Sequence, residues 1–392
     1  MPQTVKDAVS RYSGLIARLL LFVVLVYLFL VAVKMFGDAA KMYTDQYGDF
    51  WQTLVSRLNN PFVGLCLGIF ITALMQSSSA TTSLAVAMVA TGVMPLQGAV
   101  SIVMGANIGT SLTCMIVAMG HIGQKKTFAK AFSAALIQDN FNLLTVTVCF
   151  TLEVCFGYLS KMAMWLVSIL PFTQAAQATE SASWFVNPIP PAVAFPVDCL
   201  TSFLTKICGC HNTFSAIVMA ILGLIVLFFA LIQITSNMKI LMANRIEEWL
   251  NRILSKNGYL GILIGMIVTM IVQSSSITTS LMVPLVASGV LTVRTIYPIV
   301  LGANIGTTIT AILAAMAFMG SPTGELGLAL ALVHLLFNVT GVVLFYPIPQ
   351  LRLPVFMTEE LSKVLTRSRW YVAAWIACIF FVLPGLGFWL FS

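Results

Sequence analysis

Three long stretches of the chain contain no charged side chain, and this feature constrains the fold more than any other. They run from 58 to 124, from 257 to 293 and from 295 to 324. Only 8% of the 392 residues are charged and 59% are hydrophobic, whereas soluble proteins have about 25% and about 45–50%. Because a soluble fold of this length needs more charged residues on its surface, the pattern predicts an all-α integral membrane protein and excludes a cytosolic enzyme or a disordered chain.

Seven apolar segments are long enough to cross a bilayer, because a helical span needs roughly 20 residues. The first resembles a signal peptide but lacks a convincing small-x-small cleavage site, so we expect a retained helix. The seven segments are 14–33, 100–120, 131–152, 214–235, 296–319, 326–346 and 370–390.

Two further apolar regions, 62–93 and 259–290, are each interrupted by a polar Gln-Ser-Ser-Ser sequence. Each arm is too short to span the bilayer, so each region is expected to be a re-entrant helical hairpin whose tip stops near mid-membrane. Irregular backbone at that depth is tolerated only inside protein or beside water, which indicates a site.

The two halves of the chain are an internal repeat. Gln-Ser-Ser-Ser at 76–79 recurs at 273–276, and Gly-Ala-Asn-Ile-Gly-Thr at 105–110 recurs at 302–307. Without a gap, 22 of the 38 positions from 76 to 113 are identical to those from 273 to 310. We therefore expect two structurally equivalent repeats.

The basic residues predict the orientation of the chain. Most of them fall in short clusters, at 125–130, 239–256 and 352–369, and the positive-inside rule places these three segments in the cytoplasm. Because the clusters form no continuous basic face, the sequence excludes a nucleic-acid partner. The parity of the spans then predicts an inverted repeat: a first repeat over 1–171, an extracytoplasmic loop over 172–213 and a second repeat over 214–392. The N-terminus is expected in the cytoplasm and the C-terminus in the periplasm.

The repeated Ser, Thr, Gln and Asn side chains supply hydrogen-bond donors and hard, neutral oxygen acceptors. Inverted-repeat transporters place substrate and coupling ions at the repeat interface, where helix N-termini meet anions and oxygens coordinate sodium. Polar packing between helices is the alternative. It is as good an explanation for Thr81, Thr82, Ser83, Thr278, Thr279 and Ser280.

At these motifs the chain resembles the type II sodium-dependent phosphate cotransporters, in which each Gln-Ser-Ser-Ser is followed by Gly-x-Asn-x-Gly-Thr. The similarity covers roughly 60–160 and 215–385 and includes His-Leu-Leu-Phe-Asn at 334–338 and Tyr-Pro-Ile-Pro at 346–349. The resemblance implies sodium-coupled uptake of inorganic phosphate, with no cofactor beyond the sodium ions and no transition metal.

The resemblance also implies ligands, although their division between the two substrates stays open. For phosphate the candidates are Ser77, Ser78, Ser79, Thr110, Ser275, Ser276 and Lys125. For sodium they are Gln76, Asn107, Asp139, Asn142, Gln273, Ser274, Asn304, Thr307 and Thr310.

Asp139 and Asn142 match the Asp-x-x-Asn that electrogenic relatives use for an additional sodium ion. Asp139 is the only charged residue between Lys130 and Glu153, and a carboxylate at membrane depth is functional by default. Its alternative role is a structural hydrogen bond within the bundle.

The chain departs from animal relatives at 121–125, which reads His-Ile-Gly-Gln-Lys where they have Gln-x-Gly-Asp-Arg. An amide replaces an acidic sodium ligand, and Lys125 cannot make a bidentate arginine contact. Lys125 is equally explained as a cytoplasmic anchor. The only Asn-x-Ser/Thr sequon, at 338–340, lies inside a span, which favours a bacterial inner membrane.

Cys199, Cys208 and Cys210 lie in the predicted extracytoplasmic loop, where a disulfide and free thiols are equally acceptable. Their spacing fits no common zinc pattern. A homodimer is compatible with the sequence.

Three other function classes share some of these features. No Gly-Lys dipeptide exists for a nucleotide-driven pump. An intramembrane hydrolase would use Ser77 or Ser274 as nucleophile, with His334 as base and Asp139 as the acid that orients it. Such an enzyme needs only one activated serine, whereas this chain keeps both copies of Gln-Ser-Ser-Ser. A sodium symporter for sulfate or a dicarboxylate remains open.

Overall fold

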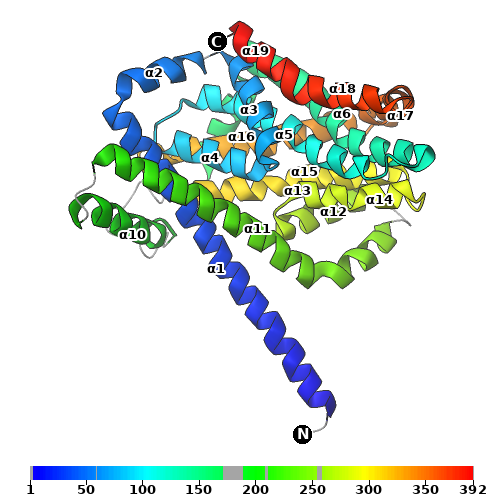
Figure 1. Cartoon of the computed structure of the whole chain (residues 1–392), viewed down its shortest axis with the longest axis horizontal. Coiled ribbons are helices and arrows are strands. Elements are labelled where there is room, and N and C mark those ends of the chain that lie inside the picture. The colour runs from blue at the N-terminus through cyan, green and yellow to red at the C-terminus, as the bar shows by residue number, and fades with distance from the viewer. Residues whose placement is uncertain (1–2, 59, 171–188, 208–210, 254–257, 392) are drawn as a thin grey trace.

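The computed structural model describes residues 3–58, 60–170, 189–207, 211–253 and 258–391. These residues form helices and contain no strand (Figure 1). In the first half the helices are α1 (Gln3–Gln46), α2 (Gly48–Arg57), α3 (Pro61–Met75), α4 (Ser78–Ala90), α5 (Leu96–Met119), α6 (Lys125–Phe156) and α7 (Tyr158–Ile169).

The second half begins with α10 (Ile189–Ser202), which continues into a π-helical turn (Phe203–Ile207). The following helices are α11 (Asn212–Ile253), α12 (Gly258–Val272), α13 (Ser275–Ser280), α14 (Met282–Ala287), α15 (Val293–Met316), α16 (Gly324–Phe345), α17 (Leu353–Leu365), α18 (Arg369–Ala377) and α19 (Leu383–Phe391). A 3₁₀ turn (Pro349–Leu351) precedes α17, and a π-helical turn (Cys378–Val382) joins α18 to α19.

Seven helical segments of the described chain are long and apolar enough to cross a membrane, at the seven predicted places. This confirms the prediction of an all-α membrane protein. The first, third and fourth segments are longer than predicted, at Gly14–Gln46, Lys126–Phe156 and Asn212–Leu241. Figure 1 shows α1 projecting beyond the other helices at its N-terminal end, with α11 lying along its C-terminal half.

Each region predicted as a hairpin contains short apolar helices that are interrupted at Gln-Ser-Ser-Ser. The first region contains α3 and α4, of 15 and 13 residues. The second contains α12, of 15 residues, followed by α13 and α14. These lengths are below that of a span. Re-entry into the membrane and the inverted orientation of the repeats stay predictions.

Glycines let the first arm of each region pack closely on the helix that follows the region. A Cβ atom on Gly68 of α3 would overlap the carbonyl oxygen of Ile102 in α5. A Cβ atom on Gly265 of α12 would overlap the carbonyl oxygen of Ile299 in α15 in the same way. Small residues of this kind let membrane helices approach backbone to backbone. The duplicated sequence therefore forms the same close contact twice.

Four helices of the described chain lie outside the predicted spans and hairpins: α2, α7, α10 and α17. α10 lies within 172–213, the segment predicted as an extracytoplasmic loop. α17 follows the sixth span, and one face of α17, formed by Val355, Thr358, Ser362 and Leu365, is buried. Arg294 at the start of α15 donates to the Glu359 carboxylate at 2.8 and 3.0 Å, and this hydrogen bonding lowers the pKa of Glu359.

We predict that Gly68→Ala and Gly265→Ala each lower the free energy of unfolding by about 1–3 kcal/mol, because the added methyl group overfills a backbone contact. Thermal unfolding of the purified protein in detergent measures the change. Gly123→Ala is the control, because a Cβ atom there meets no atom within 4 Å. Unchanged melting temperatures for the first two variants would contradict the packing argument.

Candidate functional site

The first residue of each Gln-Ser-Ser-Ser has an unusual backbone conformation. Gln76 has φ 54° and Gln273 has φ 56°, and among the described residues these are the only non-glycine residues with positive φ. Such conformations are costly for residues with a Cβ atom, and they concentrate at functional sites. They end α3 and α12 and redirect the chain into α4 and α13. We call Gln76, Ser77, Ser78 and Ser79 the first tip, and Gln273, Ser274, Ser275 and Ser276 the second tip.

Hydrogen bonds hold the first tip in place. The Ser77 hydroxyl caps α4 by accepting the backbone N–H of Ala80 at 3.2 Å. The Thr113 hydroxyl donates to Gln76 Oε1 at 3.0 Å, and the Gln76 amide nitrogen donates to the Ala73 carbonyl. Across the base of the first tip, Thr72 donates to Thr81 at 2.9 Å.

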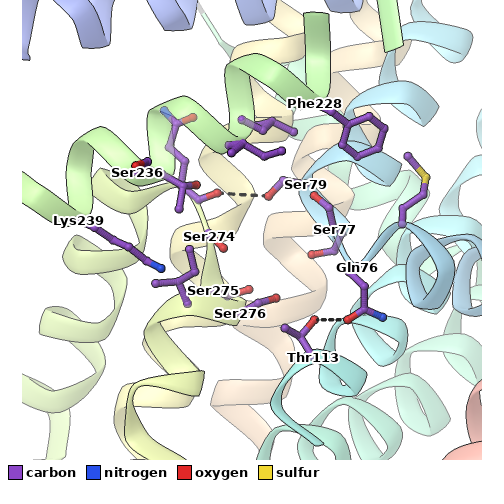
Figure 2. Close-up of a pocket in the computed structure, with 17 residues that line it drawn as sticks. Gln76, Ser77, Ser79, Thr113, Phe228, Ser236, Lys239, Ser274, Ser275 and Ser276 are labelled. Atoms are coloured by element: carbon purple, nitrogen blue, oxygen red, sulfur yellow. Dashed lines mark hydrogen bonds between the residues drawn. The ribbon is translucent and has the colours of Figure 1, made fainter. Parts of the chain in front are cut away.

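Both tips line one cavity of about 450 Å³ (Figure 2). The Ser79 hydroxyl donates to the Gln273 carbonyl at 3.5 Å and so joins the first tip to the second. Most of the remaining wall comes from α11 and includes Phe228, Ser236 and Lys239, and α5 adds Thr113. The structure therefore brings together eight of the sixteen predicted site residues. Four come from each tip, and the two tips lie 197 positions apart in the sequence.

The predicted asparagines form a second buried cluster outside that cavity. Gln138 Nε2 donates to Asn304 Oδ1 at 3.0 Å, and Asn304 Nδ2 donates to Asn142 Oδ1 at 2.8 Å. Asn142 Nδ2 in turn donates to the Asn107 carbonyl at 2.6 Å. This chain of amides connects α6 to α15 and α5, and so links the two repeats. Gln138 was not predicted as a site residue, although it lies one turn before Asn142 and on the same helix face.

His334 joins this amide cluster. Its Nε2 lies 3.3 Å from Asn107 Oδ1, and in the described part of the chain it has no hydrogen bond to Ser77 or Ser274. The structure therefore gives His334 no contact with either serine that a hydrolase would use as nucleophile.

The predicted threonine ligands lie on the helices of the repeated Gly-x-Asn-x-Gly-Thr. Thr110 donates to the Ala106 carbonyl at 2.9 Å and Thr307 to the Ala303 carbonyl at 3.0 Å, each four residues back. Thr310 donates to the Thr307 carbonyl at 3.0 Å. A hydroxyl that donates its hydrogen in this way keeps its oxygen lone pairs as acceptors.

Asp139 is fully buried in α6, with an exposed fraction of 0%. Its Oδ2 accepts a hydrogen bond from Trp375 Nε1 of α18 at 3.3 Å, and its Oδ1 has no hydrogen-bond partner among the described residues. Asn142 instead contacts α5 and α15. Asp139 and Asn142, which were predicted to act together, thus contact different neighbours.

Two further predictions concern Lys125 and the loop cysteines, which do not line this cavity or whose side chains lie outside the described part of the chain. Lys125 begins α6, but its side chain is outside the described part of the chain, as are Cys208 and Cys210. Cys199 is exposed. The expectations for these residues stay predictions.

The polar cavity residues on α11 and α5 were not predicted as site residues. They are Thr113, Thr235, Ser236 and Lys239. Lys239 was interpreted only as a marker of the cytoplasmic side. The polar run Thr-Ser-Asn at 235–237, at the end of an apolar span, was the signal that could have identified this wall.

Comparison with known proteins places these motifs in a family. The profile of the family described as Na+/Pi-cotransporter matches residues 28–167 and 226–353. Sodium-dependent phosphate transport protein 2B of Pongo abelii is 33% identical over 405 residues, which cover 84% of this chain and 59% of that protein. Sodium-dependent phosphate transport protein 2A of Ovis aries is 32% identical over 392 residues, covering 84% of this chain and 61% of that protein.

The human 2B protein is 32% identical over the same share of this chain. The chain spans about three fifths of the length of these curated relatives. No solved structure matches the chain. Because the family profile matches more than half of the chain and relatives above 30% identity match most of it, the chain belongs to the Na+/Pi-cotransporter family.

Proposed function

We propose that this protein is a secondary active transporter that couples sodium entry to the uptake of inorganic phosphate across the cytoplasmic membrane. The observation that carries the proposal is the meeting of both tips in one cavity of about 450 Å³. The family is one of transporters, and the curated relatives are named for sodium-dependent phosphate transport. We place the protein in a bacterial inner membrane, with the N-terminus in the cytoplasm and the C-terminus in the periplasm.

Phosphate suits the serine-rich part of the cavity. The hydroxyls of Ser77, Ser78, Ser79, Ser275 and Ser276 are potential donors to an oxyanion. The first turn of α4, which begins at Ser78, adds backbone N–H groups that have no partner within the helix, and the positive end of the helix dipole lies there. Neutral donors of this kind can bind an anion without holding it irreversibly.

Sodium suits the neutral oxygens that border the tips. Gln273 Oε1 is buried and has no hydrogen-bond partner among the described residues, and buried oxygens normally have a partner. A small cation would satisfy this oxygen. We assign Gln76, Asn107, Asn142, Gln273, Ser274, Asn304, Thr307 and Thr310 as the pool of sodium ligands, with Asp139 at a separate position beside α18.

Shared occupancy would couple the two substrates. An anion in a poorly hydrated cavity is costly unless positive charge accompanies it. Sodium bound nearby lowers that cost, and by linkage phosphate raises the affinity for sodium to the same extent. This reciprocity allows the sodium gradient to drive phosphate uptake.

We predict that purified protein in liposomes takes up labelled phosphate only under an inward sodium gradient, and that it takes up phosphate faster than sulfate or a dicarboxylate. Replacing sodium by choline should abolish uptake because it removes the coupling cation. Equal uptake in choline would contradict sodium coupling, whereas faster sulfate or dicarboxylate uptake would reassign the substrate.

We predict that Asp139→Asn lowers the sodium cooperativity of transport and abolishes the phosphate-induced current at fixed voltage. The variant keeps the shape of the side chain but removes the negative charge that would hold an additional sodium ion at membrane depth. Trp375→Phe is the matched control, because it removes the hydrogen bond to Asp139 and leaves the charge. An Asp139→Asn protein with full current would make this carboxylate structural.

The proposed orientation predicts from which side of the membrane an impermeant reagent can label single cysteines introduced at exposed positions. In a background without the eight native cysteines, Gln124→Cys and Ser288→Cys should react with an impermeant maleimide only from the cytoplasm. Asn212→Cys should react only from outside. If Gln124→Cys and Ser288→Cys label from opposite faces, the second hairpin crosses the membrane and the repeats are not inverted.

A further inference from the structure

Lys239 brings a positive charge to the wall of the cavity that the two tips line. It is the only charged residue among the described residues that line this cavity. Figure 2 shows its side chain extending from α11, with the amine end directed toward the second tip. The cavity therefore combines one cation with eleven hydroxyl and amide side chains, whereas the cation predicted from the sequence was Lys125.

Two contacts fix the segment of α11 that carries Lys239. The Thr235 hydroxyl donates to the carbonyl of Val272 at 3.5 Å, and Val272 directly precedes the second tip. The Asn237 amide nitrogen donates to the carbonyl of Arg18 in α1 at 2.9 Å. The segment of α11 that carries Lys239 is thus hydrogen-bonded to the residue before the second tip and to α1.

The charge of Lys239 is not neutralised by a described acidic residue. The ion pairs of the described residues join Lys34 to Asp38, Arg294 to Glu359 and Lys363 to Glu360. No acidic side chain is among the described residues that line the cavity. A lysine amine of this kind attracts an anion as a compact point charge with three donors.

We propose that Lys239 binds the phosphate oxygens opposite the serines of the second tip and favours the dianion over the monoanion. This assignment rests on the proposed function. The serines bind either form by hydrogen bonds, but a fixed positive charge attracts the doubly charged form more strongly. Lys239 therefore adds charge selectivity to a site that is otherwise built of neutral groups. Because the side chain is exposed, salt weakens its effect.

The test measures phosphate binding to the purified full-length protein in saturating sodium by isothermal titration calorimetry. Lys239→Gln should raise the Kd for phosphate roughly tenfold at low ionic strength, the size of one charge-assisted hydrogen bond. Lys239→Arg should restore the Kd, because it keeps the charge. In the wild type, binding should tighten from the acidic to the alkaline side of neutrality as phosphate becomes a dianion, and Lys239→Gln should lose most of this gain.

Lys126→Gln is the matched control, because Lys126 is exposed, is also expected to face the cytoplasm and does not line the cavity. It should bind phosphate as the wild type does. A Lys239→Gln protein with the wild-type Kd and pH dependence would overturn the assignment. Equal losses in Lys239→Gln and Lys239→Arg would overturn it too, because they would show a packing role. Absence of sodium-dependent phosphate binding in the wild type would instead overturn the proposed function itself.

Discussion

The requirement that buried backbone N–H and C=O groups be paired governs this structure. Nearly all of the described chain meets it by forming helices. At the two tips the helices break, and the last N–H group before each break still makes the helical bond to the carbonyl four residues back. The Gln76 and Gln273 N–H groups reach the carbonyls of Thr72 and Thr269 at 2.8 and 2.6 Å. The same threonines then donate to Thr81 and Thr278 at 2.9 and 2.8 Å. The same threonine contacts therefore accompany the helix break in each repeat.

The two breaks meet in one cavity. Each tip alone is a short polar turn, but the bond from Ser79 to the Gln273 carbonyl places the turns against one another. The amide chain through Asn304, Asn142 and Asn107 connects the same repeats at a second level. Because both links cross between repeats, relative movement of the repeats must change the shape of the cavity and the amide chain together.

The sequence was sufficient to predict where the spans lie and where the short helices break. A span requires a long stretch without charge, and each Gln-Ser-Ser-Ser interrupts an apolar segment with four polar residues. The sequence was not sufficient for contacts that depend on how a helix is rotated. Asp139 and Asn142 share a motif, yet they contact α18 and α15 respectively. Lys239 was predicted only to lie on the cytoplasmic side of the membrane, because nothing in its local sequence shows that α11 lies beside both tips. α17 was missed because its buried face includes Thr358 and Ser362 as well as apolar residues.

The left-handed backbone of Gln76 and Gln273 limits how these positions can change during evolution. Glycine would adopt this φ at lower energetic cost, but it would remove the amide that accepts from Thr113 in the first repeat. Most side chains would keep the backbone cost and lose the amide as well. Selection for the bend and selection for the amide therefore oppose one another at a single residue. The two copies have diverged at many aligned positions, and both keep glutamine.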